Sequence, residues 1–276
     1  MKKRIPSILI LILLLVFSHT FAQNDTLTRI PLIGEEAPAF TAETTNGTLN
    51  FPSDFGKKWK ILFSHPADYT PVCSSEILEL AYKQNDFDQL GVKIAIISTD
   101  DLSKHYGWKK SLEEVSYQGR EPVKIKFPFI DDKNRVISKS YGMISPLVNA
   151  TKAVRGVFII DPENKIASIN FYPMSVGRNT EEIKRTLIAL ETTRNQKVLM
   201  PANWQPGKDV LLPYLSQSQK EELQNSALAS NPLTQVDDDV LTPYFDEYRD
   251  TTLPQYNLDS PDIYSLTWYM FFRKWR

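Results

Sequence analysis

Short apolar runs alternate along this chain with longer stretches in which apolar residues recur at helical spacing. Runs of mostly apolar residues at 59–64 and 92–98 predict strands that are buried on both faces. Two further strands are predicted at 154–160 and 165–172, with a turn at Asp161-Pro162-Glu163-Asn164 between them. Earlier, Asn46-Gly47 lies between Thr-rich and apolar residues and predicts a two-residue hairpin turn.

Helical spacing predicts helices at about 73–90, 103–112, 134–141 and 179–193, and a strand begins within 127–131. Gly91 and Gly142 stand where helix C-caps belong, and Asn179 is placed as an N-cap. Because strands and helices alternate and the order ends in a β-hairpin and a helix, we expect an α/β fold, a central mixed β-sheet flanked by helices. Residues 31–195 would form this domain, whose order of elements resembles the thioredoxin-like topology.

The residues after 195 do not continue the alternation of strands and helices. Residues 196–229 predict an irregular C-terminal arm followed by an exposed helix at 216–228. Residues 230–276 form an additional tail, for which we predict a terminal aromatic helix because Ser260-Pro261 supplies an N-cap and a first-turn proline. Five apolar residues fall near one helical stripe: Ile263, Leu266, Tyr269, Met270 and Trp275. Such a stripe needs burial, so we expect the helix to pack on its own subunit or on a dimer partner, in preference to a membrane contact through the basic end.

The N-terminal residues indicate export. Lys2, Lys3 and Arg4 precede an apolar run at 8–17 and a small-residue site that ends at Ala22. This order is typical of a secretory signal peptide, so we expect cleavage after residue 22 and a periplasmic or secreted mature chain. An uncleaved membrane anchor is the alternative, which the shortness of the apolar run disfavours.

Charge and cysteine content narrow the function. The 276 residues contain 32 Lys and Arg against 33 Asp and Glu, for a formal net charge of −1, so nothing favours a nucleic-acid partner. Cys73 is the only cysteine, which excludes an intrachain disulfide. A single thiol in an oxidising compartment is either a buried bystander or a reactive group, and its neighbours decide between these.

Those neighbours favour a reactive thiol. The segment 66–73 places Cys73 where a buried strand meets the first turn of a helix, and the positive end of a helix dipole favours thiolate over thiol. Thr70 can bring its hydroxyl to the sulfur, and Pro66 can exclude water without adding a donor. Arg155 opens a strand that could end beside this pocket, where a guanidinium would stabilise the thiolate and the charge on a leaving oxygen.

The octet Pro66-Ala67-Asp68-Tyr69-Thr70-Pro71-Val72-Cys73 resembles the Pro-x-x-x-Thr-x-x-Cys active-site pattern of peroxiredoxins, in particular the one-cysteine, peroxiredoxin-six type. Three other segments resemble the same family: Val154-Arg155-Gly156-Val157-Phe158, Gly177-Arg178-Asn179 and Pro201-Ala202-Asn203-Trp204. The similarity extends from about residue 33 to residue 223.

The resemblance implies a thiol-dependent peroxidase that reduces hydrogen peroxide and organic hydroperoxides through a sulfenic acid on Cys73. It implies that Thr70, Pro66 and Arg155 complete the pocket and that Glu76 and Arg178 form a pair that orients Arg155. It further implies an external thiol reductant, a homodimer, and neither a cofactor nor a metal.

Two histidines and one rival function remain to be placed. His65 is either a residue near the sulfur, as in the subfamily, or a structural histidine, and we interpret His105 as a helix-surface residue. The Gly-x-Ser-x-Gly element tied to phospholipase activity in some members is absent, since 51–58 reads Phe-Pro-Ser-Asp-Phe-Gly-Lys-Lys. The alternative function is a non-enzymatic redox sensor or holdase that uses the same cysteine.

Overall fold

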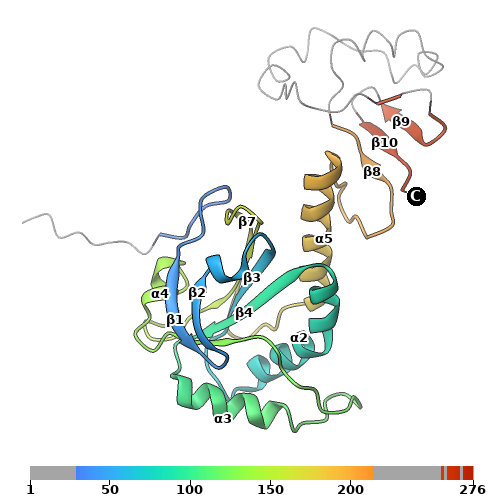
Figure 1. Cartoon of the computed structure of the whole chain (residues 1–276). Coiled ribbons are helices and arrows are strands. Elements are labelled where there is room, and N and C mark those ends of the chain that lie inside the picture. The colour runs from blue at the N-terminus through green and yellow to red at the C-terminus, as the bar shows by residue number, and fades with distance from the viewer. Residues whose placement is uncertain (1–28, 214–255, 258–259, 268–269, 276) are drawn as a thin grey trace, which may run out of the picture.

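A seven-stranded mixed sheet forms the centre of the protein in a computed structural model that describes residues 29–213, 256–257, 260–267 and 270–275 (Figure 1). The strand order is β2-β1-β5-β4-β3-β6-β7. The bounds of these strands are β1 Phe40–Thr44, β2 Gly47–Phe51, β3 Trp59–Ser64, β4 Val92–Ser98, β5 Phe129–Asp131, β6 Arg155–Ile160 and β7 Ile166–Tyr172. The expected central mixed sheet is confirmed.

Parallel and antiparallel pairing divide the sheet between its middle and its edges. β3 pairs in parallel with β4 over the whole length of β3, and β4 pairs in parallel with β5. β6 lies antiparallel to β3, and β7 is antiparallel to β6. On the other edge, β1 and β2 form the predicted hairpin, but its two turn residues are Thr45 and Asn46, and Gly47, with a φ of 96°, already pairs with Thr44.

Helices connect the strands near the predicted positions: α2 Pro71–Gln89, α3 Leu102–Leu112, α4 Val136–Ser140 and α5 Thr180–Gln196, with a short 3-10 turn η1 at Ser53–Phe55. The side chain of Asp101 caps α3 by accepting from the backbone N–H of Lys104. Asn179 caps α5 as predicted, because its side chain accepts from the N–H groups of Glu181 and Glu182. Of the described helices, none is long and apolar enough to cross a membrane.

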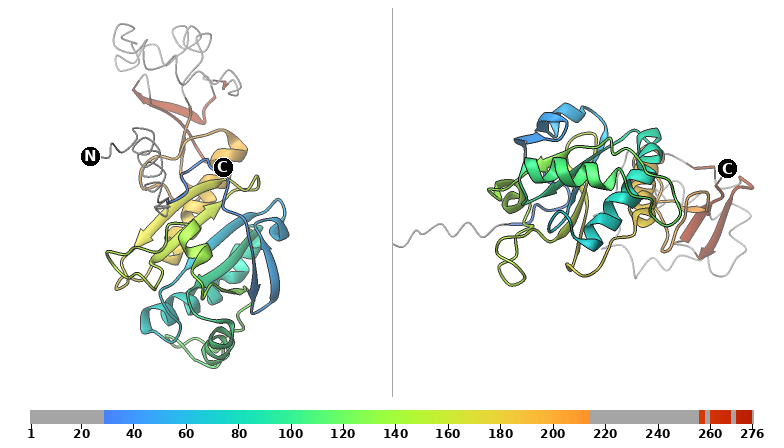
Figure 2. Two further views of the ribbon diagram at one scale, coloured as in Figure 1. Left: turned by 90° about the vertical axis from the view of Figure 1, so that its left-hand side faces the viewer. Right: turned by 90° about the horizontal axis from the view of Figure 1, so that it is seen from below.

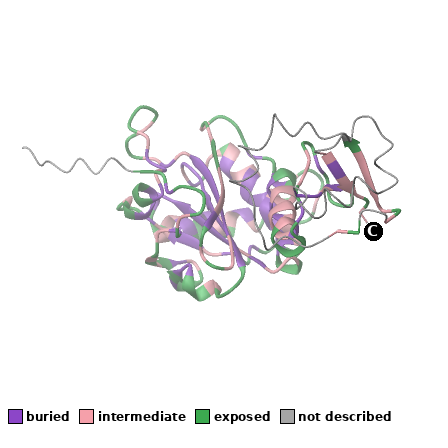
Figure 3. Cartoon of the chain, turned by 90° about the horizontal axis from the view of Figure 1, so that it is seen from above, coloured by how far each residue is buried: buried purple, intermediate pink, exposed green. Residues whose placement is uncertain are grey.

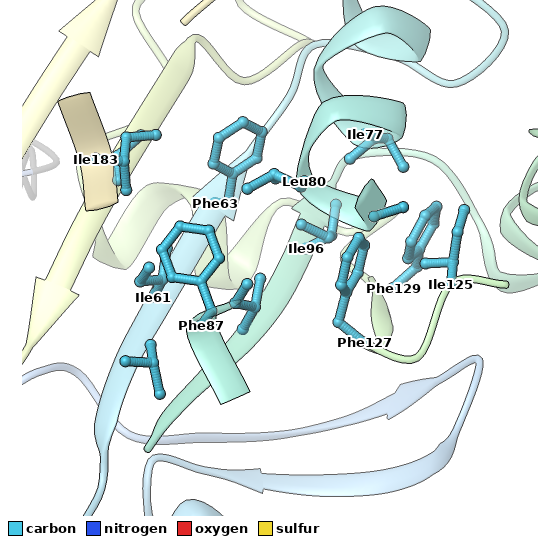
Figure 4. Close-up of a cluster of buried hydrophobic side chains, with 14 of the residues drawn as sticks. Ile61, Phe63, Ile77, Leu80, Phe87, Ile96, Ile125, Phe127, Phe129 and Ile183 are labelled. Atoms are coloured by element: carbon cyan, nitrogen blue, oxygen red, sulfur yellow. The ribbon is translucent and has the colours of Figure 1, made fainter. Parts of the chain in front are cut away.

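The sheet separates two hydrophobic clusters, because successive side chains of a strand point to opposite faces. Ile61 and Phe63 of β3 belong to one cluster with residues of α2, α3 and α5, whereas Leu62 belongs to the other with residues of α4. Figure 4 shows part of the first cluster. In Figure 3 the buried residues concentrate in this central sheet while the exposed ones lie on the outer helices and loops.

The predicted terminal aromatic helix is wrong. The described residues of the tail form two strands, β9 Ile263–Thr267 and β10 Met270–Arg273, which join β8 Val210–Leu211 of the arm in a second sheet of order β8-β10-β9. Ser260 and Pro261 enter a turn that the N–H of Ile263 closes on the Ser260 carbonyl, not the first turn of a helix. Aromatic and β-branched residues at 263–273 favour this strand conformation.

The expectation that the tail packs on its own subunit is confirmed for the described residues. Phe271 is buried with Trp204 and Val210 of the arm, and Ile263 and Trp275 pack against that cluster. Leu266 instead is 55% exposed. This small sheet lies beyond the C-terminal end of α5, apart from the seven-stranded sheet (Figure 1 and Figure 2). The predicted signal peptide, the helix at 216–228 and Tyr269 lie outside the described residues.

Candidate active site

Cys73 lies in the first turn of α2, the helix that follows the central strand β3 in the chain. The helix begins at Pro71, whose fixed φ suits the first helical position, and Thr70 is the N-cap residue in an extended conformation. Just before them, Tyr69 takes a φ of 57° and turns the chain from the loop into the helix. The side chain of Cys73 is fully buried, so its sulfur faces the protein interior.

A guanidinium reaches the sulfur from the neighbouring strand. Arg155 begins β6, and its Nη1 donates to the Cys73 Sγ at 3.2 Å and to Glu76 Oε2 at 2.7 Å. The other two nitrogens of the same group, Nε and Nη2, both donate to the Met174 carbonyl, at 3.0 and 2.6 Å. The Arg155 fork is therefore fixed on three sides, and one of its donors points at the sulfur.

Glu76 and Arg178 form the support for this arginine. Glu76 lies on α2 one turn after Cys73, and its carboxylate accepts from the backbone N–H, Nε and Nη2 of Arg178, each at 2.8 Å. The Arg178 Nη1 donates to the carbonyls of Ser64 and Gly156, and its guanidinium stacks 3.3 Å from the centre of the Phe63 ring. All of these partners hold Arg178 rigidly against two strands.

Electrostatics keeps this buried cluster charged. Burial would raise the pKa of Glu76, but the hydrogen bonds and charges of Arg178 and the charge of Arg155 outweigh it and hold that pKa below its usual range. Glu76 is thus ionised between two cations, with the Arg155 side chain 3% exposed and the Arg178 side chain fully buried. The pairing predicted for Glu76, Arg178 and Arg155 is present in the structure.

The two remaining residues of the motif, Pro66 and Thr70, belong to the segment between β3 and α2. Pro66 is buried at the end of β3. Thr70 donates its hydroxyl proton to the Ala67 carbonyl at 2.9 Å, and so ties the loop rather than the sulfur in this structure. Its predicted contact with the sulfur and a peroxide oxygen stays a prediction.

Sequence reasoning missed a second buried polar network, which joins the segment before α2 to α3. His105 is fully buried, so its interpretation as a helix-surface residue is wrong. It contacts Asp68, which also contacts His65, and all three side chains are shielded from solvent. Asp68 lies inside the motif octet. The only feature of the sequence that pointed to its partner was the presence of a histidine, His105, in the first turn of α3.

The arrangement supports nucleophilic chemistry at sulfur. The site offers one thiol, one donor fork aimed at it, and a helix N-terminus that favours the thiolate. Within the described ranges, no three histidine, cysteine, aspartate or glutamate side chains gather to hold an ion.

Comparisons with known proteins match both parts of the chain. The model of the AhpC/TSA family matches residues 33–169, and the model for the C-terminal domain of 1-Cys peroxiredoxin matches residues 189–225. A peroxiredoxin of Methanosarcina mazei is 49% identical over 185 residues, which cover 67% of this chain and 84% of that protein. Peroxiredoxin-6 of Bos taurus is 38% identical over 198 residues, covering 70% of this chain and 88% of that protein.

Solved structures agree with this assignment. A yeast mitochondrial 1-Cys peroxiredoxin, described for its thiol resolving mechanism via glutathione/thioredoxin systems, has a TM-score of 0.67 and 31% identity, and the match covers 89% of this chain and all of that one. A cysteine-to-serine mutant of peroxiredoxin 6 of Arenicola marina has a TM-score of 0.62 and 33% identity, with 70% of this chain and 88% of that chain covered.

Proposed function

Because this chain belongs to the peroxiredoxin family and is a thiol-dependent peroxidase, we propose that Cys73 is its peroxidatic residue and Arg155 its main electrostatic partner. The observation that carries this proposal is the 3.2 Å contact between the Arg155 Nη1 and the Cys73 sulfur inside a buried charged cluster. No other thiol exists in the sequence. The substrates proposed are hydrogen peroxide and organic hydroperoxides.

The reaction needs the thiolate as nucleophile. The Cys73 sulfur attacks the terminal oxygen of the hydroperoxide, so that a sulfur–oxygen bond forms and the oxygen–oxygen bond breaks. The products are a sulfenic acid on Cys73 and a leaving oxygen anion that takes one proton: an alkoxide that becomes an alcohol, or hydroxide that becomes water when the substrate is hydrogen peroxide. Arg155 can donate to the sulfur and to the oxygen on which charge develops, while Pro66 limits water near both.

Regeneration requires a thiol from outside the chain. With a single cysteine no intrachain disulfide can form, so the sulfenic acid must condense with an external thiol. The yeast relative is described with glutathione and thioredoxin systems, which supports a small thiol or a thioredoxin-like protein as reductant here. Full burial of Cys73 favours the smaller of the two unless the first turn of α2 opens.

A steady-state assay tests this function. Hydrogen peroxide and an organic hydroperoxide would be offered with dithiothreitol, glutathione or a thioredoxin system, and we expect repeated turnover with at least one thiol. If Cys73 oxidises once and stops with all of them, a redox sensor or holdase replaces the enzyme. Family membership favours the enzyme.

Export and assembly complete the proposal. The predicted signal peptide at 1–22 supports a periplasmic or secreted protein, which cell fractionation and N-terminal sequencing test: the mature chain should begin at Gln23. A chain retained in the cytoplasm with residue 1 intact would contradict this. We also propose a homodimer, for which sedimentation should give twice the mass of one chain.

A further inference from the structure

The side chain of Ser64 contacts the backbone on both sides of Arg155. Ser64 is the last residue of β3, and its hydroxyl donates to the Val154 carbonyl at 2.5 Å and accepts from the Gly156 N–H at 2.8 Å. Val154 and Gly156 are the two chain neighbours of Arg155. One hydroxyl therefore holds the main chain before and after the arginine that donates to the Cys73 sulfur.

This contact lies where the pairing of the two strands ends. The antiparallel ladder between β3 and β6 stops at the pair of Phe63 and Val157, before it reaches Arg155. On its other side, Arg155 is paired with Tyr172 of β7. The hydroxyl of Ser64 thus continues the connection to β3 past the last pair of the ladder, beside a residue whose backbone is paired with a strand on one side.

The close approach of this hydroxyl depends on a glycine. A methyl group built at Gly156 would lie 3.3 Å from the Ser64 oxygen and 3.1 Å from a ring carbon of Phe171. Both distances are shorter than ordinary van der Waals contact, so a side chain at this position would push its neighbours apart. Gly156 does not take the positive φ that favours glycine, and the close packing is therefore what requires it.

The carbonyl of Ser64 joins the same site through Arg178. The Nη1 of Arg178 donates to the Ser64 carbonyl at 2.7 Å and to the Gly156 carbonyl at 2.9 Å, so it binds the ends of both strands. The other nitrogens of Arg178 donate to Glu76, which also accepts from Arg155. Ser64 is thus connected to Arg155 by two routes, one through the backbone of β6 and one through Arg178 and Glu76.

The hydrogen bonds of Ser64 fix the orientation of its hydroxyl. The residue is fully buried. A serine hydroxyl has one hydrogen and two lone pairs, and here the hydrogen is given to a carbonyl while a lone pair receives an N–H. Without the hydroxyl, this carbonyl and this N–H would lose their partner inside the protein, and the start of β6 would have to move to find another.

We propose that Ser64 is a positioning residue for the peroxidase reaction, whose hydroxyl fixes the start of β6 so that the Arg155 Nη1 stays aimed at the Cys73 sulfur. The assignment rests on the proposed function of Cys73. Ser64 acts through Arg155, because its own polar contacts are with backbone groups and with Arg178 and not with the sulfur.

Rapid mixing with hydrogen peroxide tests the role. Ser64→Ala should slow oxidation of Cys73 by about tenfold or more, since a displacement of about 1 Å at a reacting group can lower a rate by about 10²-fold. A Ser64→Ala variant that reacts at the wild-type rate would overturn the proposal.

Tyr141→Phe is the matched control. It also removes one buried hydroxyl, which donates to the Pro38 carbonyl at 2.9 Å. Tyr141 belongs to the hydrophobic cluster on the opposite face of the sheet from Cys73. Both variants should melt at a lower temperature than the wild type, and only Ser64→Ala should react more slowly with peroxide.

A double variant shows whether Ser64 acts through Arg155. In the Arg155→Lys background the planar fork is gone, so its position no longer matters for the rate. Adding Ser64→Ala there should lower the rate by less than about twofold, because the two changes remove the same interaction. Equal factors in the wild-type and Arg155→Lys backgrounds would mean that Ser64 acts independently of Arg155, and would refute the positioning role.

Nitrogen-15 NMR of the full chain labelled at arginine reports on Arg155 without any reaction. Arg155→Lys assigns the Nε signal, whose N–H donates to the Met174 carbonyl. We expect Ser64→Ala to shift this signal and to speed its hydrogen exchange, and Tyr141→Phe to leave it unchanged. A signal that is identical in the wild type and in Ser64→Ala would contradict the proposal.

The two proposals fail in different ways. If the wild-type chain turns over no hydroperoxide with any thiol, the proposed function fails, whatever the NMR shows. If the wild type is active and Ser64→Ala loses stability but keeps both the rate and the Arg155 signal, only the positioning role is refuted. If Ser64→Ala does not fold, Gly156→Ala takes its place, because its methyl group would displace the Ser64 oxygen. An unchanged rate and Arg155 signal in that variant would then refute the role.

Discussion

Arg155 and Cys73 meet through a single atom: the Nη1 of the arginine lies 3.2 Å from the sulfur. That atom also donates to Glu76, while the rest of the guanidinium is held by the Met174 carbonyl. The contact is therefore set by a rigid planar fork, and any change in the fork moves the donor away from the sulfur.

Replacing Arg155 with lysine should keep the charge and lose most of the activity. An ammonium cannot contact Met174, Glu76 and the sulfur at once, and loss of one aimed donor typically lowers the rate constant by about 10²-fold or more. The rate of Cys73 oxidation measures this. Arg185→Lys is the matched control, because Arg185 pairs with Glu182 on the exposed side of α5, and it should react normally. Equal rates for both variants would make Arg155 a mere structural charge.

Cys73→Ser should abolish peroxide turnover while the fold persists. The chain has no other thiol that could form a sulfenic acid, and serine is nearly the same size in the buried site. Steady-state peroxide consumption and a thermal melt check the two halves of the statement. Residual catalysis by this variant would show that the nucleophile lies elsewhere.

Glu76→Gln should cost about 3–5 kcal/mol of unfolding free energy, because it leaves Arg155 and Arg178 buried without their anion. Denaturant unfolding measures the loss. The control is Glu79→Gln, which removes the partner of Arg120 at a partly exposed site and should cost about 0–1 kcal/mol.

The stability difference between the wild type and Glu76→Gln should depend on pH. The pKa of Glu76 is lowered from its ordinary value of 4.5, so its stabilising effect is present above that value and is lost as the pH falls through the lower folded-state pKa. The stability gap between wild type and Glu76→Gln should therefore shrink in acid. If the difference in unfolding free energy stays constant as the pH falls below 4.5, the ionised carboxylate of Glu76 is not the stabilising form.

Peroxide without any thiol should add oxygen atoms to Cys73 and form no dominant disulfide. Without a second cysteine, the sulfenic acid has no internal partner and proceeds to sulfinic acid. The sulfur is also buried, so two copies cannot bring their Cys73 sulfurs together without opening the site. Mass spectrometry of the intact chain and a non-reducing gel report both. A prevalent Cys73–Cys73 dimer would show that the first turn of α2 opens readily.

Phe271→Ala should destabilise the second sheet and its contact with the arm by about 3–5 kcal/mol, since Phe271 is buried against Trp204 and Val210. Leu266→Ala, at an exposed position of β9, should change little. Hydrogen exchange at β8 and β10 locates the effect. We expect the rate of Cys73 oxidation to be the same in both variants, because this sheet lies apart from the active site.

Much of the domain follows from local pattern. The apolar run at 59–64 could only be a doubly buried strand, and the structure has β3 there with all six residues buried. Motif residues around Cys73 could be assigned because a strand, a turn and a helix N-terminus occupy adjacent positions in the sequence. Arg155 was placed beside the pocket from its position at the start of a strand, whereas Arg178, which approaches Glu76 from 102 residues away, was reachable only through resemblance.

Two features were beyond local pattern for physical reasons. In the tail, the apolar residues occur at spacings that fit either a helix or a strand. The strand forms because β10 pairs with β8, and the periodicity of the tail gives no information about that pairing. His105 looked exposed because one polar residue on a helix is usually solvated. Its burial depends on Asp68 at 37 residues' distance, and no pattern within α3 announces that partner.

The strands of the second sheet are synthesised in a different order from their order in the sheet. Its middle strand, β10, comes after both of its neighbours in the chain, and β8 and β9 do not pair with each other. During synthesis β9 therefore has no neighbouring strand of this sheet until residues 270–273 emerge, and β8 has only the bridge between Leu211 and Leu199. The domain that carries Cys73 has all its strands and helices by residue 196, so it can fold while the arm is still open. A nascent chain that stalls between these points would already hold the thiol in its pocket but would expose Trp204 and Val210 to proteases and chaperones.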